Sequence, residues 1–111
     1  MESQQIDSKS LVKKIENIAK EYFVSKKEIN SIGGFLDPNV IDADSPFQKY
    51  IEKVNCAYCT LTDIEKAIIN NDFFYQNYPM WWKNSFNRST YYRYRIKAMA
   101  HFLEAFENEL I

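Results

Sequence analysis

Glycine and proline are scarce in this chain. Its 111 residues include two glycines and three prolines, which is little material for the turns of a multi-stranded sheet. It also lacks a run of about 20 apolar residues that could span a bilayer, and its first ten residues lack the basic-then-apolar order of a signal peptide. We therefore expect an all-α protein of the cytoplasm with no membrane partner.

Histidine and cysteine are rare as well. His101 is the one histidine, and no serine triad, carboxylate pair or glycine-rich loop accompanies it. Cys56 and Cys59 form a single CxxC, whereas a structural zinc needs four ligands and a redox pair usually lies in a βαβ unit. We predict no enzyme activity, no metal and no cofactor. We expect His101 at the surface or its boundary, and both cysteines as packing thiols.

Apolar and aromatic residues are abundant, at 46% and 16% of the chain. This content suffices for a folded core, and the length suits one domain or a small domain with an appended helix. The clearest break is Gly33-Gly34-Phe35-Leu36-Asp37-Pro38. We expect residues 1–60 to form a helical partner-binding or dimerising segment and residues 61–111 to form a DNA-binding domain.

Apolar spacing and capping residues predict about five helices. Ser8 or Ser10 can cap the first, Ser45-Pro46 begins the second, and the capping box Thr62-Asp63-Ile64-Glu65 begins the third. We expect the third helix to fray over residues 70–77. The predicted inward residues of the first helix are Leu11, Ile15, Ile18, Ala19 and Tyr22. Those of the second are Phe47, Tyr50, Ile51, Val54 and Tyr58, and those of the third are Ile64, Ile68 and Ile69.

The last third of the chain predicts a short helix followed by a long one. After Tyr78-Pro79, residues 80–85 allow about two helical turns, and a tight turn follows at Phe86. A long final helix capped by Asn87 then has a predicted inward line of Tyr91, Tyr94, Ala98, Phe102 and Phe106. A short helix, a tight turn and a longer helix are the parts of a helix-turn-helix, in that order.

Charge is sorted along the chain although the total is −1. Residues 1–75 carry −3, residues 76–101 carry +5 with no acidic residue, and residues 102–111 carry −3. All three arginines lie in the basic block, and a guanidinium makes forked contacts to phosphate or guanine that lysine cannot make. We therefore predict double-stranded DNA as the partner. The predicted DNA-binding residues are Lys83, Arg88, Ser89, Thr90, Tyr92, Arg93, Arg95 and Lys97.

Two roles are expected within this set. Arg88 lies one residue after the cap, at the helix end that faces base edges in a helix-turn-helix. Arg93 and Arg95 follow on either side of the inner line, so we expect at least one of them to meet phosphate.

The run Asn87-Arg88-Ser89-Thr90-Tyr91-Tyr92-Arg93, followed by Ala98 and Phe102, resembles the recognition helix of ArpU-type phage and Gram-positive transcriptional regulators. More distantly it is similar to region four of bacterial sigma factors. The resemblance covers residues 61–106 and implies a sigma-region-four-like helix-turn-helix and a role in transcription regulation. This chain departs from the family at Trp81-Trp82, where a small, Gly-containing turn is usual. We expect one of these tryptophans buried and the other partly exposed.

Two other functions fit the same sequence. The protein could be an adaptor that docks on RNA polymerase or a regulator without reading DNA, which the exposed aromatics and acidic flanks favour. It could also be a plain helical hairpin whose basic face is merely solvated. A homodimer is compatible with both the DNA-binding function and the adaptor function.

Overall fold

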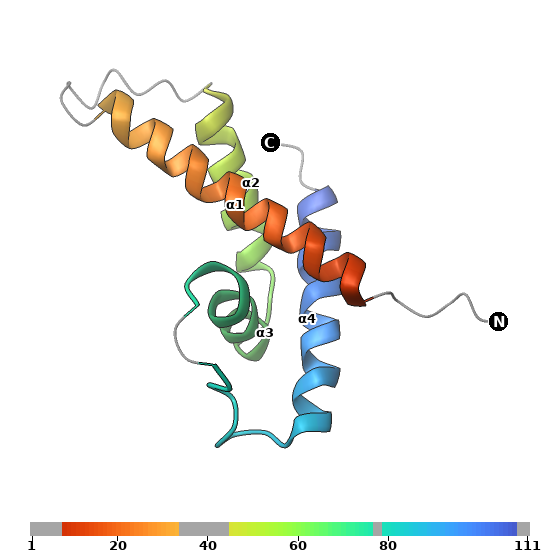
Figure 1. Ribbon diagram of the computed structural model, residues 1–111. Helices are drawn as coiled ribbons and strands as arrows, with labels where there is room; N and C mark the ends of the chain where they lie inside the picture. Colours follow the sequence, from red (N-terminus) through yellow and green to blue (C-terminus); the bar gives the residue numbers. More distant parts are fainter. Residues whose placement is uncertain (1–7, 34–44, 77–78, 109–111) are drawn as a thin grey trace.

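The computed structural model describes residues 8–33, 45–76 and 79–108 (Figure 1). Within these ranges there are four α-helices, one π-helix and no strand, so the all-α prediction is confirmed. The elements are α1 (Ser8–Gly33), α2 (Pro46–Cys59), α3 (Asp63–Ile69), the π-helix η2 (Asn70–Phe74) and α4 (Arg88–Asn108). None of these helices is long and apolar enough to cross a membrane. Of the predicted break at residues 33–38, Gly33 is the last residue of α1, and residues 34–38 lie outside the described residues.

The fifth predicted helix, over residues 80–85, is absent. This segment forms hydrogen-bonded turns, in which Lys83 N–H donates to the Met80 carbonyl at 3.0 Å. Met80 has a φ of 56°, which a right-handed helix does not contain. The physical reason is packing, because the two adjacent tryptophans both contact Tyr91. Trp82 is buried and Trp81 is half-buried, which confirms the prediction of one buried and one partly exposed tryptophan.

Local capping sets the starts of α2 and α3. The Ser45 hydroxyl accepts a hydrogen bond from Phe47 N–H, with Pro46 in the first turn. The Thr62 hydroxyl accepts from Glu65 N–H, and the Glu65 carboxylate accepts from Thr62 N–H at 3.0 Å, which completes the predicted capping box. These bonds satisfy N–H groups that have no partner within the helix.

The end of α3 differs from the prediction. Instead of fraying after Asn70, the chain continues as η2, where Tyr75 N–H donates to the Asn70 carbonyl at 2.8 Å. The Asn71 side-chain amide donates to the Ala67 carbonyl at 2.8 Å. A π-helical turn of this kind is uncommon and often occurs at functional sites.

The helices surround one core (Figure 1). Helix α1 crosses α2 and α4, and α3 with η2 lies beside α4 below that crossing. Side chains from both halves of the chain share the core, and the largest fully buried ones are Ile15, Ile68, Ile69, Met99 and Phe102.

Two residues predicted to face inward do not. Ile64, in the first turn of α3, is 41% exposed, and Tyr94 is 37% exposed. The buried face of α4 contains Tyr91, Ala98, Met99, Phe102 and Leu103. This face is rotated away from Tyr94, whose ring contacts Phe86 at the edge of the helix.

Ile68 and Ile64 provide a matched test of this packing. We expect Ile68→Ala to lower the free energy of unfolding by about 2–5 kcal/mol, because it leaves a cavity in the core. Ile64→Ala should cost less than about 1 kcal/mol, because that side chain is largely solvated already. Urea unfolding followed by circular dichroism measures both, and equal losses would contradict this placement of α3.

Candidate nucleic-acid interface

Asn87 caps the N-terminus of α4, as the sequence predicts. Its side-chain oxygen accepts a hydrogen bond from Thr90 N–H at 2.9 Å, and its carbonyl accepts from Tyr91 N–H at 2.9 Å. This cap places Arg88 and Ser89 in the first turn of the helix. Both side chains are exposed, at the helix end where the macrodipole is positive.

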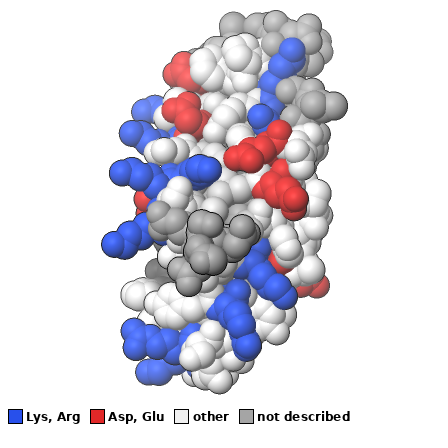
Figure 2. Space-filling view, turned by 90° about the vertical axis from the view of Figure 1, so that its right-hand side faces the viewer, with Lys and Arg blue, Asp and Glu red and all other residues white. Residues whose placement is uncertain are grey.

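Most of the predicted DNA-binding residues lie at the surface around this end of α4. Arg93 and Lys97 follow Ser89 at intervals of four residues, so the three side chains form one stripe along the helix. Arg88 and Tyr92 form a neighbouring stripe, and Lys83 lies in the preceding turn. The exposed members of the set are Lys83, Arg88, Ser89, Tyr92, Arg93 and Lys97, and Thr90 is half-buried. Figure 2 shows Lys and Arg side chains gathered at the lower end of the molecule, where α4 begins.

Arg95 does not belong to this surface, which corrects the sequence prediction. Its Nε atom lies 2.9 Å from Oδ2 of Asp72, and 22% of its side chain is exposed. Its guanidinium also lies over the Phe73 ring, 5.0 Å from the centroid. Arg95 follows Tyr91 by four residues and therefore points toward η2, where its Nε atom forms an ion pair with Asp72 and leaves the side chain only partly exposed.

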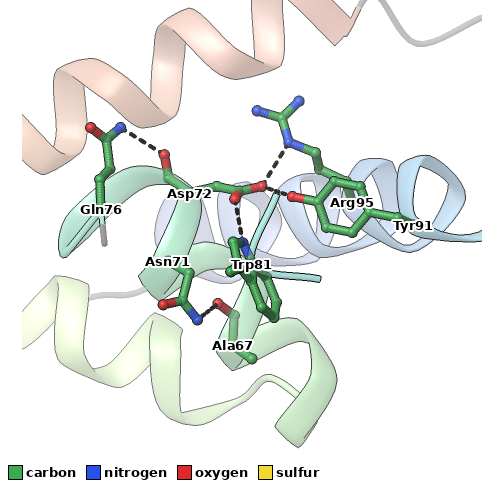
Figure 3. A network of polar contacts seen from close by, with 7 residues as sticks. All are labelled: Ala67, Asn71, Asp72, Gln76, Trp81, Tyr91 and Arg95. Carbon is green, nitrogen blue, oxygen red and sulfur yellow. Dashed lines mark hydrogen bonds and ion pairs between the residues drawn. The ribbon is translucent and has the colours of Figure 1, made fainter. Parts of the chain in front are cut away.

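Asp72 is the centre of a polar network that the sequence did not predict (Figure 3). One carboxylate oxygen accepts from Trp81 Nε1 at 2.8 Å, and the other accepts from Arg95 and from the Tyr91 hydroxyl. The network joins η2, the turn before α4 and α4 itself. Burial, followed by the Asp72 carboxylate, raises the pKa of the Tyr91 hydroxyl, so Tyr91 remains a neutral donor.

A second polar pair joins α3 to α4. His101 Nδ1 lies 2.5 Å from Oε2 of Glu65, and Glu65 is buried whereas His101 is exposed. The exposure of His101 agrees with its predicted surface position, but its partner was not predicted. Burial alone would raise the pKa of the Glu65 carboxyl. The hydrogen bonds from Thr62 N–H and His101 outweigh that effect and lower this pKa.

The remaining cations of the interface are unpaired within the described part of the chain. Neither Arg88, Arg93 nor Lys97 forms an ion pair with a described carboxylate, and residues 79–101 include no acidic residue. The start of α4 therefore presents positive charge, hydroxyl groups and a helix N-terminus to solvent. These are groups that bind phosphate oxygens and base edges.

The other sequence candidates lie elsewhere. Cys56 is half-buried and Cys59 is exposed, so the packing role predicted for Cys59 is wrong. Among the described residues no group of three His, Cys, Asp or Glu could hold a metal ion. A cavity of about 130 Å³ lies between α1, α2 and η2, and its lining residues are Tyr22, Val54, Asn55, Tyr58, Asn70, Phe74 and Tyr75.

Comparisons with known proteins identify no relative: no family model, curated protein or solved structure matches this chain.

Arg95 and Arg93 should respond differently to the same substitution. We expect Arg95→Met to lower the free energy of unfolding by about 1–3 kcal/mol, because it leaves the Asp72 carboxylate without its charged donor. Arg93→Met should change it by no more than about 0.5 kcal/mol, as is usual for surface sites. Denaturant melts of the two variants measure this difference, and a stability loss at Arg93 equal to that at Arg95 would refute the assignment.

Glu65 should contribute to acid unfolding. Because folding lowers the pKa of its carboxyl, its stabilising effect is complete above the unfolded pKa of about 4.3 and is lost as the pH falls through the folded pKa. We expect Glu65→Gln, which can still close the capping box, to lose less stability than the parent between pH 6 and pH 3. Thermal melts across this range measure the effect, and parallel pH curves for the two proteins would count against it.

Proposed function

We propose that this protein binds double-stranded DNA sequence-specifically through the start of α4 and regulates transcription. The observation that carries the proposal is the contrast among the three arginines. Arg95 is neutralised by Asp72, whereas Arg88 and Arg93 are exposed without a carboxylate partner in the described part of the chain. Exposed guanidiniums on a capped helix are suited to base edges and phosphates.

The geometry supports a division of labour in this interface. Arg88 and Ser89 lie in the first turn of α4 and would face base edges when this end of the helix enters the major groove. Arg93 and Lys97 lie one and two turns further along the same stripe as Ser89 and would meet phosphates. Arg95 is less suited to phosphate contact than Arg93, because its Nε atom is paired with Asp72 and its side chain is less exposed.

The pair α3 and α4 supports a sigma-region-four-like arrangement. These helices pack against each other, the Glu65–His101 pair joins α3 to α4, and the Asp72–Arg95 pair joins the adjoining η2 to α4. In this proposal α3 with η2 takes the place of the first helix of the motif, because residues 79–85 form turns. The connection between η2 and α4 is then longer than a tight turn, and tertiary contacts set the orientation of the helices on either side of it.

A second candidate function is a protein adaptor. Phe23 and Tyr75 are 36% and 48% exposed, and their rings contact each other beside the cavity between α1 and η2. Exposed aromatic residues are typical anchors of protein interfaces. RNA polymerase or a regulator would be the partner of such a surface.

Arg88 and Arg93 test the DNA-binding proposal. A site is first selected from random duplexes with the purified protein, and affinity for this site and a scrambled site is then measured across a salt series. We expect Arg88→Ala to lose about 10- to 100-fold in affinity for the selected site, corresponding to about 1–3 kcal/mol, with relaxed preference at one position. Arg93→Ala should weaken both duplexes alike and flatten the salt slope by about one unit.

Lys49→Ala is the control, because Lys49 is an exposed cation on α2, away from the start of α4. Melting curves verify that each variant is folded. If the parent selects no duplex, or if both arginine variants bind as Lys49→Ala does, the basic end of α4 is only solvated and the adaptor function is preferred.

A further inference from the structure

Helix α1 presents a row of lysines that the charge count along the sequence conceals. Lys13, Lys20 and Lys27 are spaced by seven residues, which is nearly two full turns, so they lie on one face of α1. Lys9 precedes Lys13 by four residues and lies on the same face. All four side chains are exposed, and the row from Lys9 to Lys27 extends about 27 Å along the helix.

The other solvent-facing side of α1 has a different charge pattern. Lys14, Glu21 and Glu28 follow one another by seven residues there and are all exposed. The two sides of α1 are therefore electrostatically distinct, although residues 1–75 together are acidic. Within the described part of the chain, Lys13, Lys20 and Lys27 are not paired with a carboxylate.

The lysine row begins beside α4. Lys9 and Lys13 line an open cleft between α1 and α4 together with Ser8, Val12, Glu16 and Arg95. Glu16 is the one carboxylate of that lining, and Arg95 is held by Asp72 on its inner side. In Figure 2 a column of Lys and Arg side chains follows the left edge, on the side where α1 lies, and leads toward the basic group at the start of α4.

We infer that this row, Lys9, Lys13, Lys20 and Lys27, is a second contact surface for the phosphate backbone of the duplex that α4 binds. The inference rests on the proposed function. Duplex DNA carries a regular line of negative charge, and a row of cations that extends away from the reading helix matches it without distinguishing bases. Phosphate contacts of this kind fix the orientation of the protein on DNA and contribute affinity that is independent of sequence.

Two double variants with equal net charge separate this role from a general loss of positive charge. Lys13→Gln with Lys20→Gln removes two cations of the row. Lys14→Gln with Lys49→Gln removes two exposed cations outside it. We expect the row variant to bind selected and scrambled duplexes about tenfold more weakly at 0.15 M salt, with a salt slope smaller by about two units. The control variant should stay within about twofold of the parent, and melting curves verify folding.

Three results would overturn the inference. If the row and control variants bind alike while Arg88→Ala still loses preference for its site, any loss of affinity reflects net charge alone, and only the α1 role fails. If the parent binds no duplex at all, the proposed function fails and the α1 role fails with it. If the parent instead binds phosphatidylserine vesicles, and the row variant does not, the row is a contact surface for anionic membranes.

Discussion

The carboxylate of Asp72 is the interaction on which the arrangement of α4 depends. It accepts hydrogen bonds from Trp81, Tyr91 and Arg95, so one side chain of η2 joins the turn before α4 to the first two turns of α4. Burying a carboxylate is costly unless charged and neutral donors compensate it. This compensation turns Arg95 toward η2 and leaves it only partly exposed, unlike Arg88 and Arg93.

The same constraint explains the charge of the candidate interface. With Arg95 neutralised, Arg88 and Arg93 remain as exposed guanidiniums, and Lys97 extends their surface by one turn. The Glu65–His101 pair holds the later part of α4 to α3 in the same way. A helix held at two points presents its basic side in one orientation, which is what recognition of a duplex requires.

Local sequence signals predicted the starts of α2, α3 and α4, whereas Ser8 and Ser10, the predicted caps of the first helix, lie within α1. The caps at Ser45, Thr62 and Asn87 depend on residues within three positions of each other, and the structure contains all three. The burial of Ile68 and Ala98 followed from helical spacing in the same way. The turns over residues 79–85 could not be predicted locally, because two tryptophans pack on one tyrosine of the next helix.

The candidate site could be predicted only in part, because its polar pairs join residues that are far apart in the sequence. Arg95 and Asp72 are 23 residues apart, and His101 and Glu65 are 36 apart, so no periodicity in the sequence indicates either pair. The lysine row of α1 was hidden because a charge sum does not distinguish the two sides of a helix. Helical spacing alone predicted that Arg88 and Arg93 are exposed. The pairing of Arg95 with Asp72, which sets it apart from the exposed arginines, is visible only in the tertiary structure.

The most direct measurement uses the three arginine side chains, whose Nε–H groups give three signals in a ¹H–¹⁵N spectrum. We predict that the Arg95 signal is protected from exchange in the free protein and unchanged when the selected duplex is added. The Arg88 and Arg93 signals should shift or become protected only in the complex. A duplex that shifts the Arg95 signal and leaves the other two unchanged, or that shifts none of the three, would contradict DNA binding through Arg88 and Arg93.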